Sequence, residues 1–218
     1  MGALHEAKRR GVCAAIRRTG TFCFIEGRLM EQEPKAVIMD AQAMDRAIVR
    51  IAHEIIEHNE GADTIAVVGI IRRGEILAHR LVDAIEDIEH VKPPFGSLDI
   101  SFYRDDFGIS SAPVVHATNI PFSVEGKDII LVDDVLYTGR TVRSALNALM
   151  DYGRAKSVQL AVMVDRGHRE LPIRADYVGK NVPSSREEDV RVCIEPLDPH
   201  TAVEIWNKAD EPSDGGVH

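Results

Sequence analysis

The sequence has few cysteines and no long apolar run. The three cysteines among its 218 residues, Cys13, Cys23 and Cys193, show no metal-type spacing and indicate reduced thiols in a cytoplasm. No run reaches the length of a transmembrane helix. The N-terminus has basic residues but no apolar core before a small-residue cleavage site, which argues against a secretory signal. We therefore expect a cytoplasmic protein with no membrane partner.

The sequence also lacks an excess of positive charge. Its formal net charge at pH 7 is −9, and residues 1–29 carry six basic and two acidic residues, a charge of +4, which leaves −13 for the remainder. A segment with this much negative charge does not bind nucleic acid nonspecifically. Any RNA site must therefore be a local basic patch.

The chain length suits one α/β domain with extensions. Residues 1–33 keep no sustained hydrophobic period, so we expect a flexible N-terminal extension whose first 29 residues are dispensable; a genuine arm is the alternative. The domain pattern covers residues 34–208. Residues 209–218 contain proline, serine and adjacent glycines, which predict a disordered tail.

Strand and helix patterns alternate along the domain. The expected strands are residues 36–39, 64–70, 98–103, 128–132, 157–164, 191–195 and 202–206. Helical spacing follows Asp40, a candidate N-cap, and recurs after residues 71–74 and 138–141. This alternation predicts a mainly parallel twisted sheet flanked by helices, with ligands outside the carboxyl ends of the strands.

One stretch, residues 128–142, joins a buried strand to polar chemistry. Four apolar residues, 129–132, fit a strand buried on both faces, and two carboxylates, Asp133 and Asp134, follow. The turn at 138–141 then starts a helix, where unpaired N–H groups and the helix dipole favour a phosphate. The carboxylates could accept hydrogen bonds from ribose hydroxyls. A solvated acid pair and an ordinary cap remain the alternative for a lone Asp-Asp, but they account less well for the whole string.

Three further segments fall at predicted strand ends. The turn with Arg72 and Arg73 has the strand–turn–helix form of an anion site, and two arginines suit a pyrophosphate. An irregular segment of about a dozen residues begins at Arg104 and is typical of a lid. The polar segment 165–188 follows the last predicted parallel strand. All of these could line a single cleft.

The stretch at 128–142 resembles the phosphoribosyl-diphosphate (PRPP) signature of the type I phosphoribosyltransferases. From residue 35 to about 208 the chain is similar to a family of bifunctional uracil phosphoribosyltransferases that regulate pyrimidine operons. The segments that carry this resemblance are 68–74, 103–106, 130–143 and 164–183, and the last of these is specific to the family.

The resemblance implies a type I phosphoribosyltransferase fold with a hood, about residues 165–188, over the strand ends. It implies the reaction of uracil with PRPP to give UMP and pyrophosphate, with Mg²⁺ bound through PRPP near Asp133 and Asp134. The residues expected at the site are Asp133, Asp134, Arg73 and Arg104 for catalysis, Arg72, Arg73, Val135, Leu136, Tyr137, Thr138, Gly139, Arg140 and Thr141 for PRPP, and Arg166 with the backbone near Val182 for uracil.

The resemblance also implies UMP- or UTP-dependent binding of the pyrimidine-operon mRNA leader, which represses expression by attenuation or related means. The matching residues are Arg50, His53, His168, Arg169, Arg174 and Lys180. The chain departs from the family at Val49, often a threonine, and at His58, usually basic. A solvated face or subunit contacts are the alternative for these basic residues, and a homodimer or higher homo-oligomer is expected.

Two other functions remain open at this point. One is a UMP- or UTP-sensing RNA-binding regulator with vestigial transferase activity. The other is a purine phosphoribosyltransferase, which shares the phosphate site and differs in the hood. The complete set of Asp133, Asp134, Arg73 and Arg104 favours retained catalysis.

Overall fold

The computed structural model describes residues 22–25, 28–31, 33–101 and 117–208, which fall into two compact units, Met1–Glu33 and Pro34–His218. In the first unit, strands β1 (Phe22–Ile25) and β2 (Arg28–Glu31) pair antiparallel, a hairpin that the sequence patterns did not predict. The flexibility and dispensability of this extension stay predictions. Within the described residues, no helix combines the length and apolar character needed to cross a membrane.

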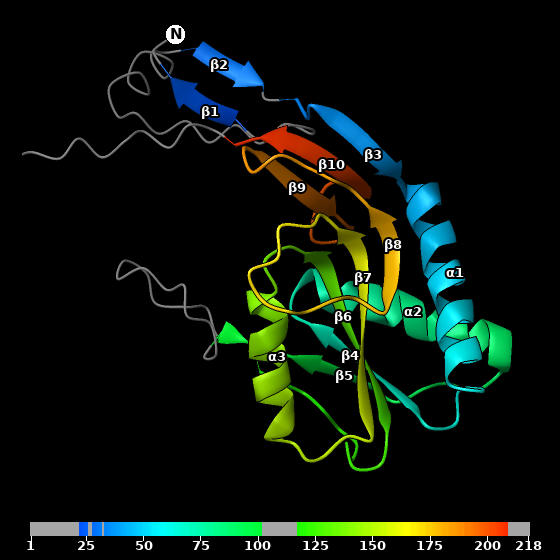
Figure 1. Cartoon of the computed structure of the whole chain (residues 1–218). Helices are drawn as coiled ribbons and strands as arrows, with labels where there is room; N and C mark the ends of the chain where they lie inside the picture. The colour runs from blue at the N-terminus through cyan, green and yellow to red at the C-terminus, as the bar shows by residue number, and fades with distance from the viewer. Residues whose placement is uncertain (1–21, 26–27, 32, 102–116, 209–218) are drawn as a thin grey trace, which may run out of the picture. The chain divides into compact units, whose positions relative to one another are not determined.

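The second unit is built on a five-stranded parallel sheet with the order β5-β4-β6-β7-β8 (Figure 1). Its strands are β4 (Ile65–Ile70), β5 (Phe95–Leu98), β6 (Asp128–Leu136), β7 (Ser157–Asp165) and β8 (Tyr177–Asn181). The central strand, β6, pairs in parallel with β4 and β7 along its apolar run. The predicted mainly parallel α/β sheet is confirmed.

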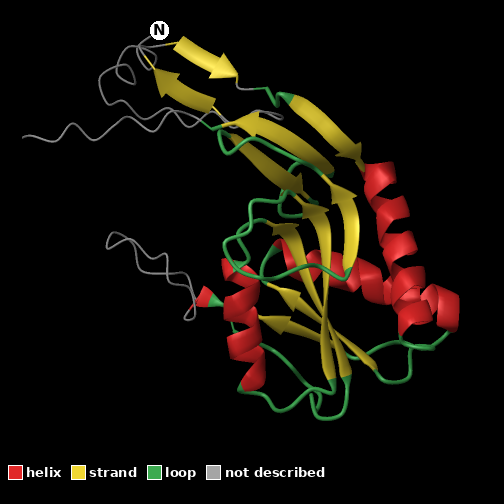
Figure 2. Cartoon of the chain, in the orientation of Figure 1, coloured by secondary structure: helices red, strands yellow, loops and turns green. Residues whose placement is uncertain are grey.

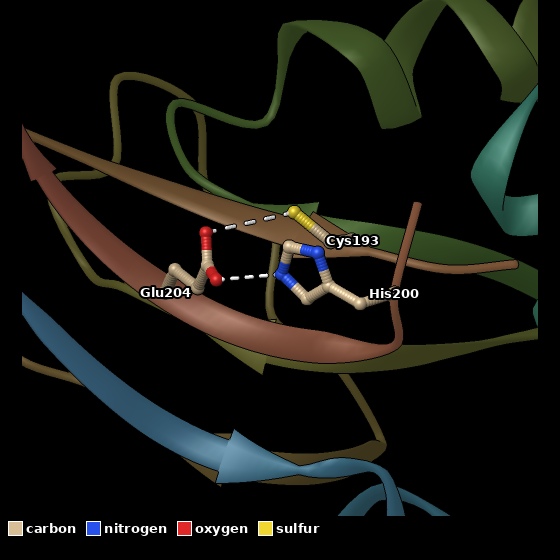
Figure 3. A group of neighbouring side chains, drawn as sticks. All are labelled: Cys193, His200 and Glu204. Atoms are coloured by element: carbon tan, nitrogen blue, oxygen red, sulfur yellow. Dashed lines mark hydrogen bonds and ion pairs between the residues drawn. The ribbon is translucent and has the colours of Figure 1, made fainter. Parts of the chain in front are cut away.

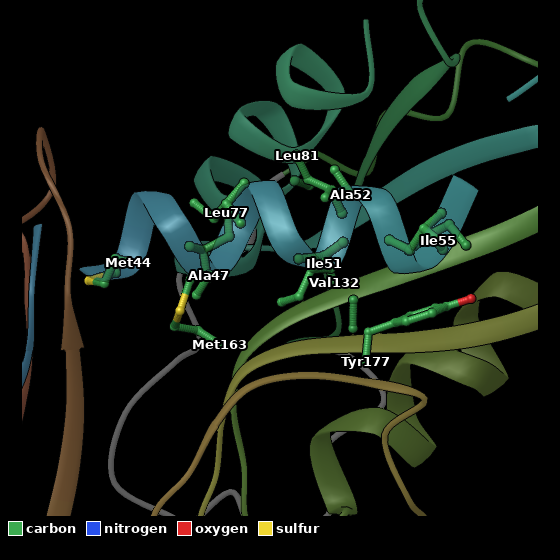
Figure 4. Packing of buried hydrophobic residues seen from close by; sticks show 14 of the residues in the cluster. Met44, Ala47, Ile51, Ala52, Ile55, Leu77, Leu81, Val132, Met163 and Tyr177 are labelled. Carbon is green, nitrogen blue, oxygen red and sulfur yellow. The ribbon is translucent and has the colours of Figure 1, made fainter. Parts of the chain in front are cut away.

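Helices cover both faces of this sheet (Figure 2). They are α1 (Ala41–His58), α2 (Arg73–Glu89) and α3 (Arg140–Met150). Side chains alternate across a strand, so Ile130 and Val132 of β6 join the core under α1 and α2, whereas Ile129 and Leu131 join the core under α3. Figure 4 shows the apolar face of α1 in the first core. A four-residue apolar run is thus explained by burial on both faces.

A smaller antiparallel sheet has the order β3-β10-β9, formed by β3 (Ala36–Asp40), β9 (Glu188–Cys193) and β10 (Ala202–Asn207). The last residue of β3, Asp40, caps α1, because the backbone N–H of Ala43 donates to its Oδ1 at 2.7 Å. The predicted cap and the two predicted closing strands are therefore present.

Two predictions about strands differ from the structure. The strand expected at 98–103 is wrong over residues 99–101, since β5 ends at Leu98, and residues 102 and 103 lie outside the described residues. The carboxylate of Asp99 accepts hydrogen bonds from the N–H and hydroxyl of Ser101, at 2.8 and 2.6 Å, and these local bonds replace a strand ladder. Strand β8 also lies inside the segment 165–188, so part of the expected hood belongs to the main sheet.

A buried carboxylate at the start of β6 connects three strands of the sheet. The side chain of Asp128 is 6% exposed. It accepts hydrogen bonds from the hydroxyls of Thr64 and Ser157, at 2.8 and 2.7 Å, and from the ammonium group of Lys156 at 2.8 Å. Burial alone would raise the pKa of Asp128, but these hydrogen bonds outweigh it and the pKa is lowered.

We expect Asp128→Asn to lower the free energy of unfolding by about 1.5–3 kcal/mol at neutral pH, since the ion pair with Lys156 is lost. Because the folded pKa lies below the unfolded value of about 3.9, this stabilisation is present above pH ~4 and is lost as the pH falls through the folded pKa. Denaturant unfolding across pH measures it, with the exposed Asp63→Asn as control. A difference that persists unchanged at about pH 2 would contradict the assignment.

Candidate active site

The turn between β6 and α3 encloses a hollow of about 190 Å³ lined by residues 135–142. It is smaller than the ~300–1,000 Å³ of sites for drug-sized ligands, which suits a phosphate group. Gly139 is the N-cap of α3 with a left-handed φ of 92°, and a Cβ there would lie 3.4 Å from the Ile173 side chain. The structure therefore brings the seven expected phosphate-binding residues, 135–141, to the N-terminus of a helix.

The acid pair lies at the carboxyl end of β6, beside this turn. Asp133 is 5% exposed and Asp134 is half-buried. The N–H of Asp134 donates to Oδ1 of Asp133, and the N–H of Val135 donates to Oδ1 of Asp134, each at 2.9 Å. Each carboxylate is thus oriented by the backbone of the following residue.

The arginine turn reaches this acid pair because two glycines allow close backbone contact. A Cβ on Gly69 would lie 2.5 Å from Cα of Glu75, so α2 starts directly against β4. A Cβ on Gly74 would lie 2.5 Å from the carbonyl oxygen of Val132 and 3.2 Å from Cα of Asp133. The start of α2 and the end of β6 therefore meet at a point where no larger residue fits.

Within this turn the two arginines differ. Arg72 is exposed, whereas Arg73 forms a two-pronged contact with Asp198, with Nε–Oδ2 at 3.1 Å and Nη2–Oδ1 at 2.8 Å. The hydrogen bond with Asp198 raises the pKa of Arg73, and the charge of Asp134 adds to this. Asp198 is a site residue that sequence reasoning missed, since nothing in the sequence links two positions 125 residues apart.

Arg166 and Val182, the two residues expected to surround uracil, both form hydrogen bonds within the protein. Arg166 is 4% exposed, and its guanidinium carbon lies 4.2 Å from the ring centroid of Tyr137. Its nitrogens donate to Oγ of Ser184 at 3.0 Å and to the carbonyl of Glu188 at 2.7 Å. The N–H of Val182 donates to the carbonyl of β7 residue 165 at 2.8 Å. Arg166 thus links the phosphate turn to the segment before β9.

Arg169, one of the residues expected to contact RNA, holds the phosphate turn in the free chain, and its contact with RNA stays a prediction. Its guanidinium donates to the carbonyl oxygens of Tyr137 and Ile173, each at 2.9 Å, and pairs with the carboxylate of Asp165. The neighbouring His168 contacts the carbonyl of Ser184 through Nε2 at 2.6 Å. These two side chains therefore hold backbone carbonyl groups of the phosphate turn and of the segment after β8.

The other expected RNA residues lie elsewhere. Arg50 donates to the carbonyls of residues 178 and 179 in β8, at 3.0 and 2.8 Å, and Lys180 donates to the carbonyl of β3 residue 38 at 3.1 Å. His53 is exposed on α1, and Arg174 is exposed before β8. No hydrogen bond or ion pair joins this group to His168 or Arg169 in the described part of the chain. Arg104 and the expected lid lie outside the described residues.

Comparison with known proteins identifies the family. The model of the phosphoribosyl transferase domain matches residues 36–195. The chain is 60% identical over 162 residues to the bifunctional protein PyrR of Roseiflexus sp. strain RS-1, which covers 74% of this chain and 88% of that protein. It is 57% identical over 175 residues to the bifunctional protein PyrR of Thermus aquaticus, covering 80% and 97%. The chain belongs to the PyrR family.

Solved structures agree on the fold of this family member. A hypoxanthine phosphoribosyltransferase from Trypanosoma cruzi superposes with a TM-score of 0.64 at 18% identity, covering 80% of this chain and 96% of that chain. A hypoxanthine phosphoribosyltransferase from Staphylococcus aureus gives a TM-score of 0.60 at 19% identity, covering 80% and 94%. The predicted type I phosphoribosyltransferase fold is confirmed.

The contacts of Arg169 predict a loss of stability on its removal. We expect Arg169→Ala to lower the free energy of unfolding by about 1.5–3 kcal/mol, because carbonyl groups and a carboxylate lose a charged donor. The exposed Arg174→Ala is the matched control and should stay within about 0.5 kcal/mol of wild type. Denaturant unfolding measures both variants; equal stabilities would refute the role given to Arg169.

Proposed function

We propose that the chain transfers the phosphoribosyl group of PRPP to uracil, giving UMP and pyrophosphate, and regulates pyrimidine biosynthesis genes by nucleotide-dependent binding of their mRNA. The main support is the acid pair of β6 placed directly before a phosphate-sized hollow at the start of α3. Membership of a family whose relatives are named bifunctional supports the two activities together.

The ribose phosphate would bind along the end of β6. Backbone N–H groups at the start of α3, with the hydroxyls of Thr138 and Thr141, would hold the 5′-phosphate. Asp133 and Asp134 would accept hydrogen bonds from the ribose hydroxyls. Since the backbone already orients both carboxylates, little ordering is left for the bound state.

Cleavage of the C1–pyrophosphate bond leaves positive charge on the ribose and negative charge on the leaving group. The carboxylates of Asp133 and Asp134 would stabilise the first. Arg72 offers an exposed guanidinium for the second, and Arg73 would exchange Asp198 for the pyrophosphate. Arg104, on the expected lid, would close over it and keep water away. Positioning and electrostatics supply the rate, so no strong base is required.

The donor set at the end of β6 fits Mg²⁺. Mg²⁺ prefers oxygen ligands and is usually held by one or two carboxylates together with substrate phosphates, and two adjacent aspartates offer this. Asp133 and Asp134 would hold the ion where it enters with PRPP. The bound ion would neutralise charge on the pyrophosphate.

Uracil would lie between the phosphate turn and the segment around Val182. Arg166 is buried and hydrogen-bonded, so its part is to position Tyr137 and the backbone of 184–188 around the base. The purine alternative shares the fold, as the hypoxanthine enzymes show, but the identity with PyrR proteins favours uracil. We also expect a cytoplasmic homo-oligomer.

We expect Asp134→Asn to lower kcat for UMP formation roughly 100-fold while leaving thermal unfolding unchanged, because a charge facing the reacting ribose is lost. A PRPP-dependent assay with uracil, hypoxanthine and guanine measures activity and base choice together. Asp63→Asn, an exposed acid far along the chain from the acid pair, is the control. Full activity of the Asp134 variant would overturn its role, and a preference for purines would overturn the choice of base.

The RNA activity predicts a specific salt dependence. We expect Lys180→Ala to weaken UMP-dependent binding of the organism's pyrimidine leader RNA. The slope of the logarithm of the binding constant against the logarithm of the salt concentration should fall in magnitude by about 1, since one phosphate contact is lost. Lys92→Ala, in the segment after α2, is the control and should leave binding unchanged. Filter binding with and without UMP across salt concentrations measures this. Binding that ignores UMP and falls equally for both variants would reduce the interaction to nonspecific attraction.

A further inference from the structure

Three side chains with metal-binding atoms converge on the antiparallel sheet (Figure 3). They are Cys193 at the end of β9, His200 in the following loop and Glu204 on β10, and their ligand atoms all lie within 4.8 Å of one another. Cys193 pairs with Ala202, so Glu204 is its diagonal neighbour on the same face of the sheet. The loop and the strand pairing therefore place thiol, imidazole and carboxylate together.

The carboxylate of this group is buried and oriented. Glu204 is 4% exposed, and the indole N–H of Trp206 donates to its Oε2 at 2.9 Å. Its Oε1 lies 2.7 Å from Nε2 of His200. In the described part of the chain, Glu204 has no ion pair with lysine or arginine. The pairing of β10 with β9 is regular from Ala202 to Asn207, so Glu204 has a fixed position in the sheet.

The set of ligand types selects the metal. Sulfur, nitrogen and oxygen donors in a three-residue set with a fourth position for water are characteristic of Zn²⁺. Mg²⁺ and Ca²⁺ prefer oxygen ligands alone, so they fit this group poorly. The exposed His200, 46% accessible at its side chain, gives the site access to solvent, and Trp206 acts as the outer partner that orients a ligand.

We propose that Cys193, His200 and Glu204 bind one Zn²⁺ ion. The thiol of Cys193 supplies the sulfur ligand, the imidazole of His200 the nitrogen ligand and the carboxylate of Glu204 the oxygen ligand. On binding, the S–H bond of Cys193 breaks, a sulfur–zinc bond forms and the thiol proton passes to water. The ring proton that His200 holds at Nε2 against Glu204 moves to Nδ1 by exchange with water, which frees Nε2 to bind the metal. Affinity therefore increases with pH.

The site is linked to the arginine turn by the loop that it encloses. Cys193 and His200 bracket residues 194–199, which include Asp198, the partner of Arg73. Within this loop the N–H of Ile194 donates to the Asp198 carboxylate at 2.9 Å, and the N–H of Asp198 donates to the Ile194 carbonyl at 3.0 Å. A metal joining the two ends of the loop would restrain Asp198 and, through it, Arg73.

The test uses the full chain with Cys13→Ser and Cys23→Ser, which leaves Cys193 as the sole thiol. Titration with Zn²⁺ is expected to show one ion per chain, and Co²⁺ is expected to show thiolate-to-metal charge-transfer absorption. Cys193→Ser should abolish that absorption. His200→Ala, a change at an exposed side chain that leaves the fold intact, should weaken Zn²⁺ binding roughly 100-fold, and the exposed His58→Ala should not.

Several outcomes would overturn the proposal. They are equal Zn²⁺ affinity in the parent and the His200 variant, absence of the charge-transfer band, and competition by equimolar Mg²⁺. Amide hydrogen exchange measures the loop separately. Zn²⁺ is expected to slow exchange at Ile194 and Asp198 in the parent and not in His200→Ala; unchanged rates would refute the restraint. All these readouts use the metal alone, so they do not depend on transferase activity.

Discussion

The contact of α2 with the end of β6 determines the arrangement of the candidate site. Gly69 and Gly74 let the helix start within van der Waals contact of two strands, where a single Cβ would overlap backbone atoms. This contact places the arginine turn beside Asp133. The phosphate turn follows in the same strand, so one central strand supplies both the acids and the anion site. Charges of both signs therefore meet at one edge of the sheet without long loops between them.

Three arginines of the candidate site are of two kinds: one is exposed, and two form hydrogen bonds within the protein. Arg72 is exposed, whereas Arg166 and Arg169 use their donors on carbonyl and hydroxyl oxygens of the protein. A guanidinium offers five donors in a fixed plane, which suits it to hold several loop carbonyls at once. The backbone of the phosphate turn is thus supported by side chains from the segment after β7, far along the chain.

The sequence was sufficient to predict those parts of the candidate site that consist of consecutive residues. The apolar run, the acid pair and the glycine turn of 128–142 are consecutive, so their order along the chain is their order in space. The strand predicted from residue 98 was wrong at residues 99–101 because hydrogen bonds to the Asp99 side chain replaced the strand ladder. The alternation of apolar and polar residues cannot reveal such bonds. Asp198 and the role of Arg169 depend on long-range contacts, which one sequence does not display.

The burial of Arg166 has a consequence for the empty and occupied states. Its charge is surrounded mainly by neutral acceptors and an aromatic ring, and among the described residues the carboxylate paired with it, that of Asp189, is 4.0 Å away. A cation that has left water with so little compensation raises the free energy of the folded chain. An anion bound in the hollow that Tyr137 lines would add the opposite charge near this side chain, so ligand binding and folding would be thermodynamically linked. The protein would then be most stable when it carries its ligand.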